Sequence, residues 1–101
     1  MEENTLPFKF SLNQNYPNPF NPSTKIKFTL PNVGDENFRP LQTQLIVYDI
    51  LGRDIKTLLN KPMQPGEYQV DFDATGLPSG VYFYRLSSGS FSQTRKMVLI
   101  R

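Results

Sequence analysis

The 101-residue sequence contains no cysteine, no histidine and no tryptophan. Without cysteine the chain cannot form disulfides or thiolate metal sites, although this does not fix its compartment, because many exported domains also lack disulfides. Without histidine it lacks the usual general base and the most common transition-metal ligand. No hydrolytic triad can be assembled, and the sequence has no phosphate-binding glycine loop. We therefore predict that the protein is not an enzyme and that it uses no cofactor.

Long apolar runs and clusters of one charge are also missing. The formal net charge is +2 and the basic residues do not form a run, so nucleic-acid binding is not expected. No segment approaches the roughly eighteen apolar residues of a membrane span. Residues 1–4 lack the basic flank and apolar stretch of a signal peptide. A chain starting here would be cytosolic, whereas a piece of a longer exported protein would look the same. The size predicts one domain, which we expect to be monomeric.

Short segments of alternating polarity, separated by turn residues, make up most of the chain. In residues 24–30, for example, Ile26, Phe28 and Leu30 share one face. We predict strands over 24–30, 41–50, 55–59 and 67–73, a C-terminal hairpin over 81–100, and a short edge strand within 6–13. Residues 51–59 could also form a helix, but Gly52 and Pro62 favour a hairpin arm. About seven strands predict an all-β, antiparallel, Greek-key β-sandwich of immunoglobulin type, with a polar loop over 31–40.

A proline-rich segment precedes the first long strand. Three prolines fall within residues 15–24, and they exclude both a helix and a central strand. Tyr16 and Phe20 are large aromatic residues that a disordered linker would rarely contain. We therefore expect an ordered loop that these two rings attach to the body of the domain.

Two acidic residues on one strand are the first candidates for chemistry. Asp71 and Asp73 share a face, with Glu67 in line, as a glycosidase pair or a calcium site would require. The alternative is a solvated face whose charges keep the sheet soluble. We favour the solvated face, because no pocket-forming sequence surrounds the carboxylates, although metal binding by this pair stays open.

Tyr82 and Tyr84 share a face of another strand, with Phe83 opposite. Exposed rings at these positions could stack on sugars, as in a carbohydrate-binding module. The alternative is that one face of the strand fills the sandwich core. With aromatic residues at 13% of the sequence, a core can absorb most of them, so we favour core filling.

Five segments, in order along the chain, resemble the type A C-terminal sorting domain of the type IX (Por) secretion system. They are residues 12–24, with Asn-Tyr-Pro-Asn-Pro-Phe-Asn-Pro, and residues 47–53, 65–68, 79–82 and 96–101. Segment 65–68 is similar to the family's Pro-x-Gly-x-Tyr turn but has one residue fewer between proline and glycine. The loop over 31–40 is the other departure. The middle of the chain also resembles the immunoglobulin-like domain of flagellar hook capping proteins, which bears on fold only.

The resemblance implies a secretion signal carried by exported proteins of Bacteroidetes-like bacteria. Such proteins reach the periplasm through their own signal peptide. The outer-membrane translocon then recognises the C-terminal domain, and a sortase-like protease usually removes it. The implied partners are translocon components, that protease and an N-terminal passenger domain. The implied location is the periplasm in transit and then the cell surface or the exterior. Residues 1–11 would be linker and 12–101 the sorting domain.

We place recognition at two turns and at the last strand. Our hypothesis is that 96–101, supported by the turn over 80–82, forms the recognition element, since an edge strand presents unpaired backbone groups that a partner can extend. The alternative is that these residues only complete the fold. A different function, that of a carbohydrate-binding or spacer module of a secreted glycoside hydrolase, is the second interpretation. The predicted recognition residues are Pro65, Gly66, Tyr68, Gly80, Tyr82, Lys96, Met97, Val98, Leu99, Ile100 and Arg101.

Overall fold

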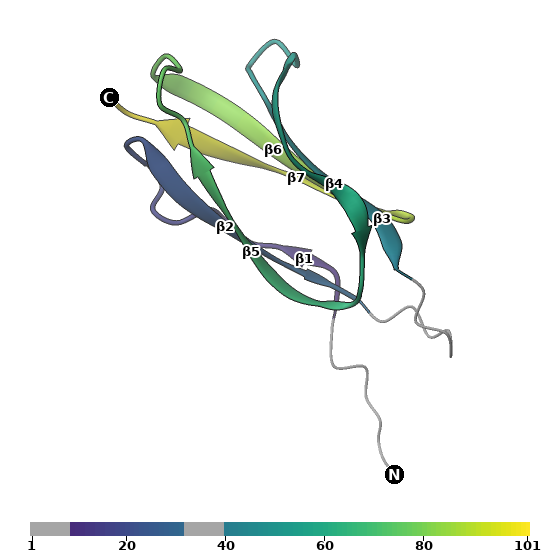
Figure 1. The fold of residues 1–101 in the computed structure, drawn as a ribbon. Coiled ribbons are helices and arrows are strands. Elements are labelled where there is room, and N and C mark those ends of the chain that lie inside the picture. The colour runs from purple at the N-terminus through teal and green to yellow at the C-terminus, as the bar shows by residue number, and fades with distance from the viewer. Residues whose placement is uncertain (1–8, 32–39) are drawn as a thin grey trace.

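Two antiparallel β-sheets pack face to face in the computed structural model, which describes residues 9–31 and 40–101 (Figure 1). One sheet has the strand order β1-β2-β5 and the other β4-β3-β6-β7. The chain changes sheet between β2 and β3, β4 and β5, and β5 and β6, which is the Greek-key arrangement. The predicted all-β sandwich is confirmed. The strands are β1 (Ser11–Leu12), β2 (Ser23–Leu30), β3 (Leu41–Tyr48), β4 (Asp54–Met63), β5 (Gly66–Asp73), β6 (Gly80–Ser88) and β7 (Phe91–Leu99).

Alternation of side chains builds the core between the sheets. In β2, Ile26 and Phe28 are buried while Lys25 and Lys27 are exposed, because successive side chains of a strand point to opposite faces. The other sheet contributes buried residues in the same way. Each fully buried side chain of this size stabilises the fold by about 1.5–3 kcal/mol. The largest fully buried side chains include Tyr84, Phe20, Phe28, Phe72, Leu86, Met97 and Leu99.

Strand β4 is longer than the predicted arm over 55–59. It continues through Pro62, which pairs with Gln42. Proline is tolerated there because β4 is an edge strand, whose outer side needs no amide donor. Two irregularities in its pairing with β3, together with exposed Lys56 and Lys61, discourage further strand addition. Because residues 54–59 lie in strand β4, the helical alternative for 51–59 is wrong.

Two predicted features lie partly outside the described residues. Of the polar loop over 31–40, residues 32–39 are not described. Of the edge strand expected within 6–13, the described part forms β1, which pairs with β2 through Ser11 and Thr29. Phe10 stacks on Phe91 with ring centroids 5.2 Å apart. The folded part therefore includes Phe10, although the sorting domain was expected to begin at residue 12.

The sandwich has two chemically different ends. Phe10 and Phe91 mark the N-terminal end, together with the β4–β5 and β6–β7 turns. The opposite end, called here the distal end, comprises the β3–β4 turn (49–53), the β5–β6 loop (74–79) and residues 100–101 (Figure 1). Strand β7 runs from one end to the other, which over nine residues is about 30 Å.

Candidate functional site

The outer edge of the last strand is covered by the chain's own proline-rich segment, residues 14–20. The Phe20 amide donates to the Val98 carbonyl at 2.9 Å, and the Ile100 amide donates to the Phe20 carbonyl at 2.9 Å. The Val98 amide donates to Asn18 Oδ1 at 2.9 Å, and Gln14 Nε2 donates to the Lys96 carbonyl at 2.6 Å. The backbone groups of Lys96, Val98 and Ile100 that make these bonds are therefore already paired within the chain, which contradicts the expectation that this edge is unpaired.

A buried polar network and the buried ring of Phe20 hold the proline-rich segment in place, whereas Tyr16, the other ring expected to attach it, is 79% exposed. The Tyr84 hydroxyl donates to the Asn13 carbonyl at 2.7 Å and accepts from the Asn15 amide at 2.8 Å. Asn15 Nδ2 donates to Thr24 Oγ1 at 3.0 Å, and Thr24 Oγ1 donates to the Pro17 carbonyl at 2.8 Å. Burial raises the pKa of the Tyr84 hydroxyl, so it stays neutral and can act as both donor and acceptor.

The predicted recognition residues of the last strand differ in what they can offer a partner. Met97 and Leu99 are buried in the core. Lys96 is exposed, and Ile100 is 49% exposed just beyond β7. Arg101 Nε donates to the Leu77 carbonyl at 2.8 Å, which attaches the last residue to the β5–β6 loop. Only part of this segment is therefore surface, and that part lies toward the distal end.

The two glycine-x-tyrosine turns share one geometry. Gly66 has φ of +152° and Gly80 has φ of +149°, a region that residues with a side chain rarely adopt. Two residues after each glycine, a tyrosine hydroxyl bonds back to the carbonyl four residues before the tyrosine. Tyr68 Oη donates to the Gln64 carbonyl at 2.7 Å, and Tyr82 Oη donates to the Pro78 carbonyl, also at 2.7 Å.

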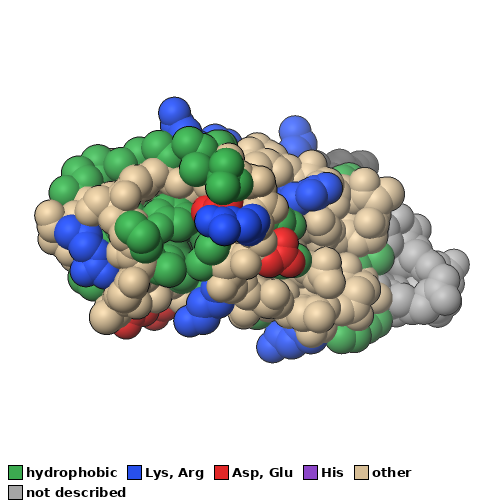
Figure 2. All heavy atoms as spheres, turned by 90° about the horizontal axis from the view of Figure 1, so that it is seen from above, with side chains coloured by type: hydrophobic (Ala, Val, Ile, Leu, Met, Phe, Trp, Pro, Cys, Tyr) green, Lys and Arg blue, Asp and Glu red, His purple; other side chains and the backbone are tan. Residues whose placement is uncertain are grey.

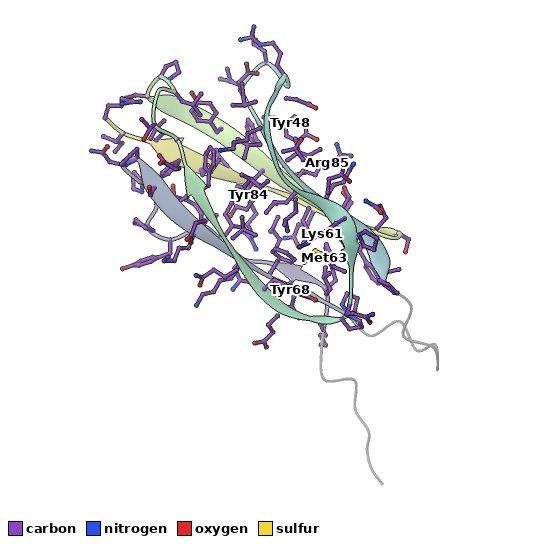
Figure 3. The ribbon with its side chains drawn as sticks, in the orientation of Figure 1. Tyr48, Lys61, Met63, Tyr68, Tyr84 and Arg85 are labelled. Carbon is purple, nitrogen blue, oxygen red and sulfur yellow. The ribbon has the colours of Figure 1, made fainter. Side chains whose placement is uncertain are left out.

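These two turns lie at opposite ends of the sandwich. Gly66 pairs with Leu30 at the N-terminal end, where Tyr68 also lies (Figure 3). Gly80 pairs with Leu99 at the distal end. Pro65, Gly66 and Tyr68 are therefore not brought together with Gly80, Tyr82 and residues 96–101. Each turn stabilises the point at which the chain enters a new sheet.

The β3–β4 turn is a surface that the predicted site residues did not include. Asp49 Oδ1 accepts from the amides of Leu51 and Arg53, each at 2.9 Å, and Asp49 Oδ2 accepts from Arg53 Nε at 2.7 Å. The Arg53 amide, then the Arg53 guanidinium and the Leu51 amide, lower the pKa of the Asp49 carboxyl, against the effect of its burial. Ile50 and Leu51 are consequently fixed at the tip, with 71% and 74% of their surface exposed.

The carboxylates of Asp71 and Asp73 each bond to a neighbouring residue on the same surface. Asp71 forms an ion pair with Lys25 at 3.1 Å. Asp73 Oδ1 accepts from the hydroxyl of Thr75 at 2.6 Å and from its amide, and these bonds lower the pKa of the Asp73 carboxyl. Within residues 9–31 and 40–101, no group of three or more acidic, histidine or cysteine side chains could hold a metal ion. The arrangement agrees with a solvated face.

Tyr82 and Tyr84 both point into the core, as predicted, and Phe83 lies on the opposite face. Figure 3 shows Tyr84 in the interior, between the two sheets. Rings in this position are not available for stacking on a sugar. This removes the observation on which the carbohydrate-binding interpretation rested.

Comparison with known proteins matches most of the described chain to one family. Residues 14–100 match the secretion system C-terminal sorting domain. Curated proteins give no match to the chain. The described residues contain no helix long and apolar enough to cross a membrane. The family match runs from the proline-rich segment to the residue after β7, and therefore covers both partners of the covered edge. The chain belongs to the secretion system C-terminal sorting domain family, the sorting signals of type IX secretion.

Proposed function

We propose that this domain directs an N-terminally attached passenger protein through the outer-membrane translocon of the type IX system. The observation that carries the proposal is the family match over residues 14–100. On this proposal the domain occupies the periplasm in transit and reaches the cell surface or the exterior with its passenger. The proposed function requires no catalytic group, because a sorting signal only has to be bound by the translocon.

The mode of recognition that the fold supports is binding to the surface of the folded domain. Addition of a partner strand to β7 would require displacement of the Phe20 and Asn18 contacts. The exposed predicted residues, Lys96, Ile100 and Arg101, can instead be reached without unfolding. They lie away from Phe10, on whose side the passenger would be attached.

Removal by a sortase-like protease forms the second part of the proposal. Leu12 is buried, and its carbonyl accepts a hydrogen bond from the Arg95 guanidinium. A cut within β1 would therefore break the fold, whereas a cut before Lys9 would leave the described domain whole. We place the cleavage site on the N-terminal side of Lys9, within the proposed linker.

The test is export of a fluorescent reporter with a periplasmic signal peptide at its N-terminus and residues 1–101 at its C-terminus. The host is a type IX-competent bacterium, compared with the same strain lacking the translocon. We expect the reporter outside the cell only when the translocon is present. Retention of a reporter whose C-terminal domain is folded, shown by protease resistance of the domain, would overturn the proposal.

Deletion of residues 96–101 cannot by itself separate recognition from folding. We still expect the truncated reporter to stay in the periplasm. However, the deletion removes Met97 and Leu99 from the core, and loss of two such residues costs several kcal/mol, about 2–5 each. Variants of exposed residues separate recognition from folding more sharply.

A further inference from the structure

A groove of about 370 Å³ lies at the distal end, between the β3–β4 turn and the β5–β6 loop. Figure 2 looks down on this end and shows hydrophobic side chains gathered there, with lysine and arginine side chains among them. A second hollow of about 280 Å³ adjoins the groove on the outer side of the four-stranded sheet and shares Ile50 with it. The apolar lining of the groove comes from Ile50, Leu51, Ile55, Leu77, Pro78 and Val81.

Ile50 and Leu51, at the tip of the 49–53 turn, are held in a fixed position although most of their surface is exposed. Five hydrogen bonds close the 49–53 turn, three of them to the Asp49 carboxylate. Gly52, with φ of +84°, lets the chain reverse without strain. Ile50 and Leu51 therefore face solvent in a fixed arrangement. A prearranged apolar surface loses little conformational entropy when a partner covers it.

The charges beside the groove favour an acidic partner. Arg53 lines the groove, and Arg101 bonds to its wall through the Leu77 carbonyl and Ser79 Oγ. Arg85 lines the adjoining hollow beside Tyr48, and both side chains lie on the outer side of the sheet (Figure 3). Among the described residues that line the groove and the hollow, the one acidic side chain is Asp49, which is paired with Arg53.

The same charges argue against a second copy of this chain as the occupant. Two copies related by a twofold axis would bring the same surface patch together. Besides the Asp49–Arg53 ion pair, each patch carries Arg85 and Arg101, so like charges would face each other across an apolar contact. Like charges at close range oppose association. A partner with carboxylates avoids this repulsion.

We propose that the groove at the distal end docks a segment of a translocon protein that carries aliphatic side chains next to carboxylates. Ile50 and Leu51 form the apolar contact, and Arg85 and Arg101 flank it. This inference rests on the proposed sorting function and adds to it the surface that the translocon binds. It also assigns the last residue a role in shaping the groove wall.

The test uses the exported reporter with the double substitution Ile50→Ser and Leu51→Ser. Both side chains are mostly exposed, so the thermal midpoint of the purified 101-residue chain should change by no more than about 4 °C. The secreted fraction should fall about tenfold or more, as for loss of an apolar binding hot spot. The matched control is Tyr16→Ser, because Tyr16 is 79% exposed and lies outside the groove. It should leave export within about twofold of the wild type.

A charge substitution tests the acidic character of the partner. Arg85→Glu should reduce export several-fold, whereas Lys27→Glu, on the exposed face of β2, should not. A competition experiment measures docking itself. The 101-residue chain, sent to the periplasm without a passenger, should reduce export of the wild-type reporter, and its Ile50→Ser, Leu51→Ser form should not.

The outcomes distinguish this inference from the sorting function. If the wild-type reporter is not exported, the sorting function itself fails. If it is exported and the double variant is exported and competes equally well, the groove is not the docking surface. Equal loss with Tyr16→Ser would also overturn the inference. So would an Ile50- and Leu51-dependent dimer in sedimentation, or equally dependent binding to vesicles of anionic phospholipid, because each identifies a different occupant.

Discussion

At the scale of single residues, the Tyr84 hydroxyl is the atom that joins the core to the proline-rich segment. It satisfies the Asn13 carbonyl and the Asn15 amide, which come from a stretch of chain about seventy residues away. Substitution Tyr84→Phe keeps the ring and leaves both backbone groups without this partner. We expect a loss of about 1–3 kcal/mol in the free energy of unfolding, measured from urea denaturation at neutral pH. Tyr16→Phe, at an exposed ring, is the control and should have no effect.

The same hydroxyl should make stability depend on pH in the alkaline range. Burial raises the pKa of Tyr84 above its ordinary value of 10.0, although the Asn15 amide and Arg95 act in the opposite direction. Because the folded pKa exceeds the unfolded one, the contribution of the neutral hydroxyl is complete below the unfolded pKa. It is lost as the pH rises through the folded pKa. The difference in urea midpoint between wild type and Tyr84→Phe should therefore shrink above about pH 10. A constant difference up to about pH 11 would contradict this assignment.

At the scale of elements, the covered edge of β7 depends on single contacts that can be removed one at a time. Asn18→Ala removes the acceptor of the Val98 amide and leaves the backbone bonds of Phe20 in place. Hydrogen exchange of the Val98 amide should accelerate about fivefold, corresponding to roughly 1 kcal/mol for one hydrogen bond. Asn21→Ala provides a matched control, because Asn21 is also exposed and also precedes a proline. Unchanged exchange at Val98 would show that Asn18 does not protect this edge.

The elements themselves were largely predictable from the sequence, because burial on one face leaves a period of two. The alternation in 24–30 and 67–73 gave strands within one residue of β2 and β5. The length of β4 was not predictable, because a proline ends a central strand but not an edge strand, and edge position is a property of the assembled sheet. The partner of β7 was missed for the same kind of reason. A proline-rich segment shows no alternation, although the Phe20 backbone pairs with a strand about eighty residues away.

The candidate site was predictable only in part. Glycine-x-tyrosine spacing correctly marked two special turns, since the positive φ of Gly66 and Gly80 is a local requirement. That the two turns lie at opposite ends depends on strand order, which no local pattern contains. The exposed Ile50 and Leu51 were interpreted as the end of a strand and the start of a turn. The signal that could have identified them is an aspartate four residues before an arginine, with a glycine between, around two adjacent aliphatic residues.

At the scale of the whole molecule, the two ends would relate differently to the proposed passenger. The chain enters at the N-terminal end through Phe10, while the groove and the last residues lie at the distal end. On the proposed function, a strand about 30 Å long separates the proposed docking groove from the end at which a passenger would be attached. Such a separation would allow one sorting signal to serve unrelated passengers, and it predicts that the two ends tolerate insertions differently.

Insertion of six glycine and serine residues tests this difference between the ends. Between Thr75 and Gly76, in the exposed part of the distal loop, the insertion should reduce reporter export about tenfold by obstructing the groove. Between Gly89 and Ser90, in the β6–β7 turn at the N-terminal end, it should leave export within about twofold. The insertion doubles the six-residue distal loop and quadruples the two-residue β6–β7 turn, so at about 0.6 kcal/mol per doubling the costs are about 0.6 and 1.2 kcal/mol, and both domains should remain folded. If both insertions reduced export equally while both domains remained folded, recognition would extend over the whole sandwich, and the distal end would have no special role.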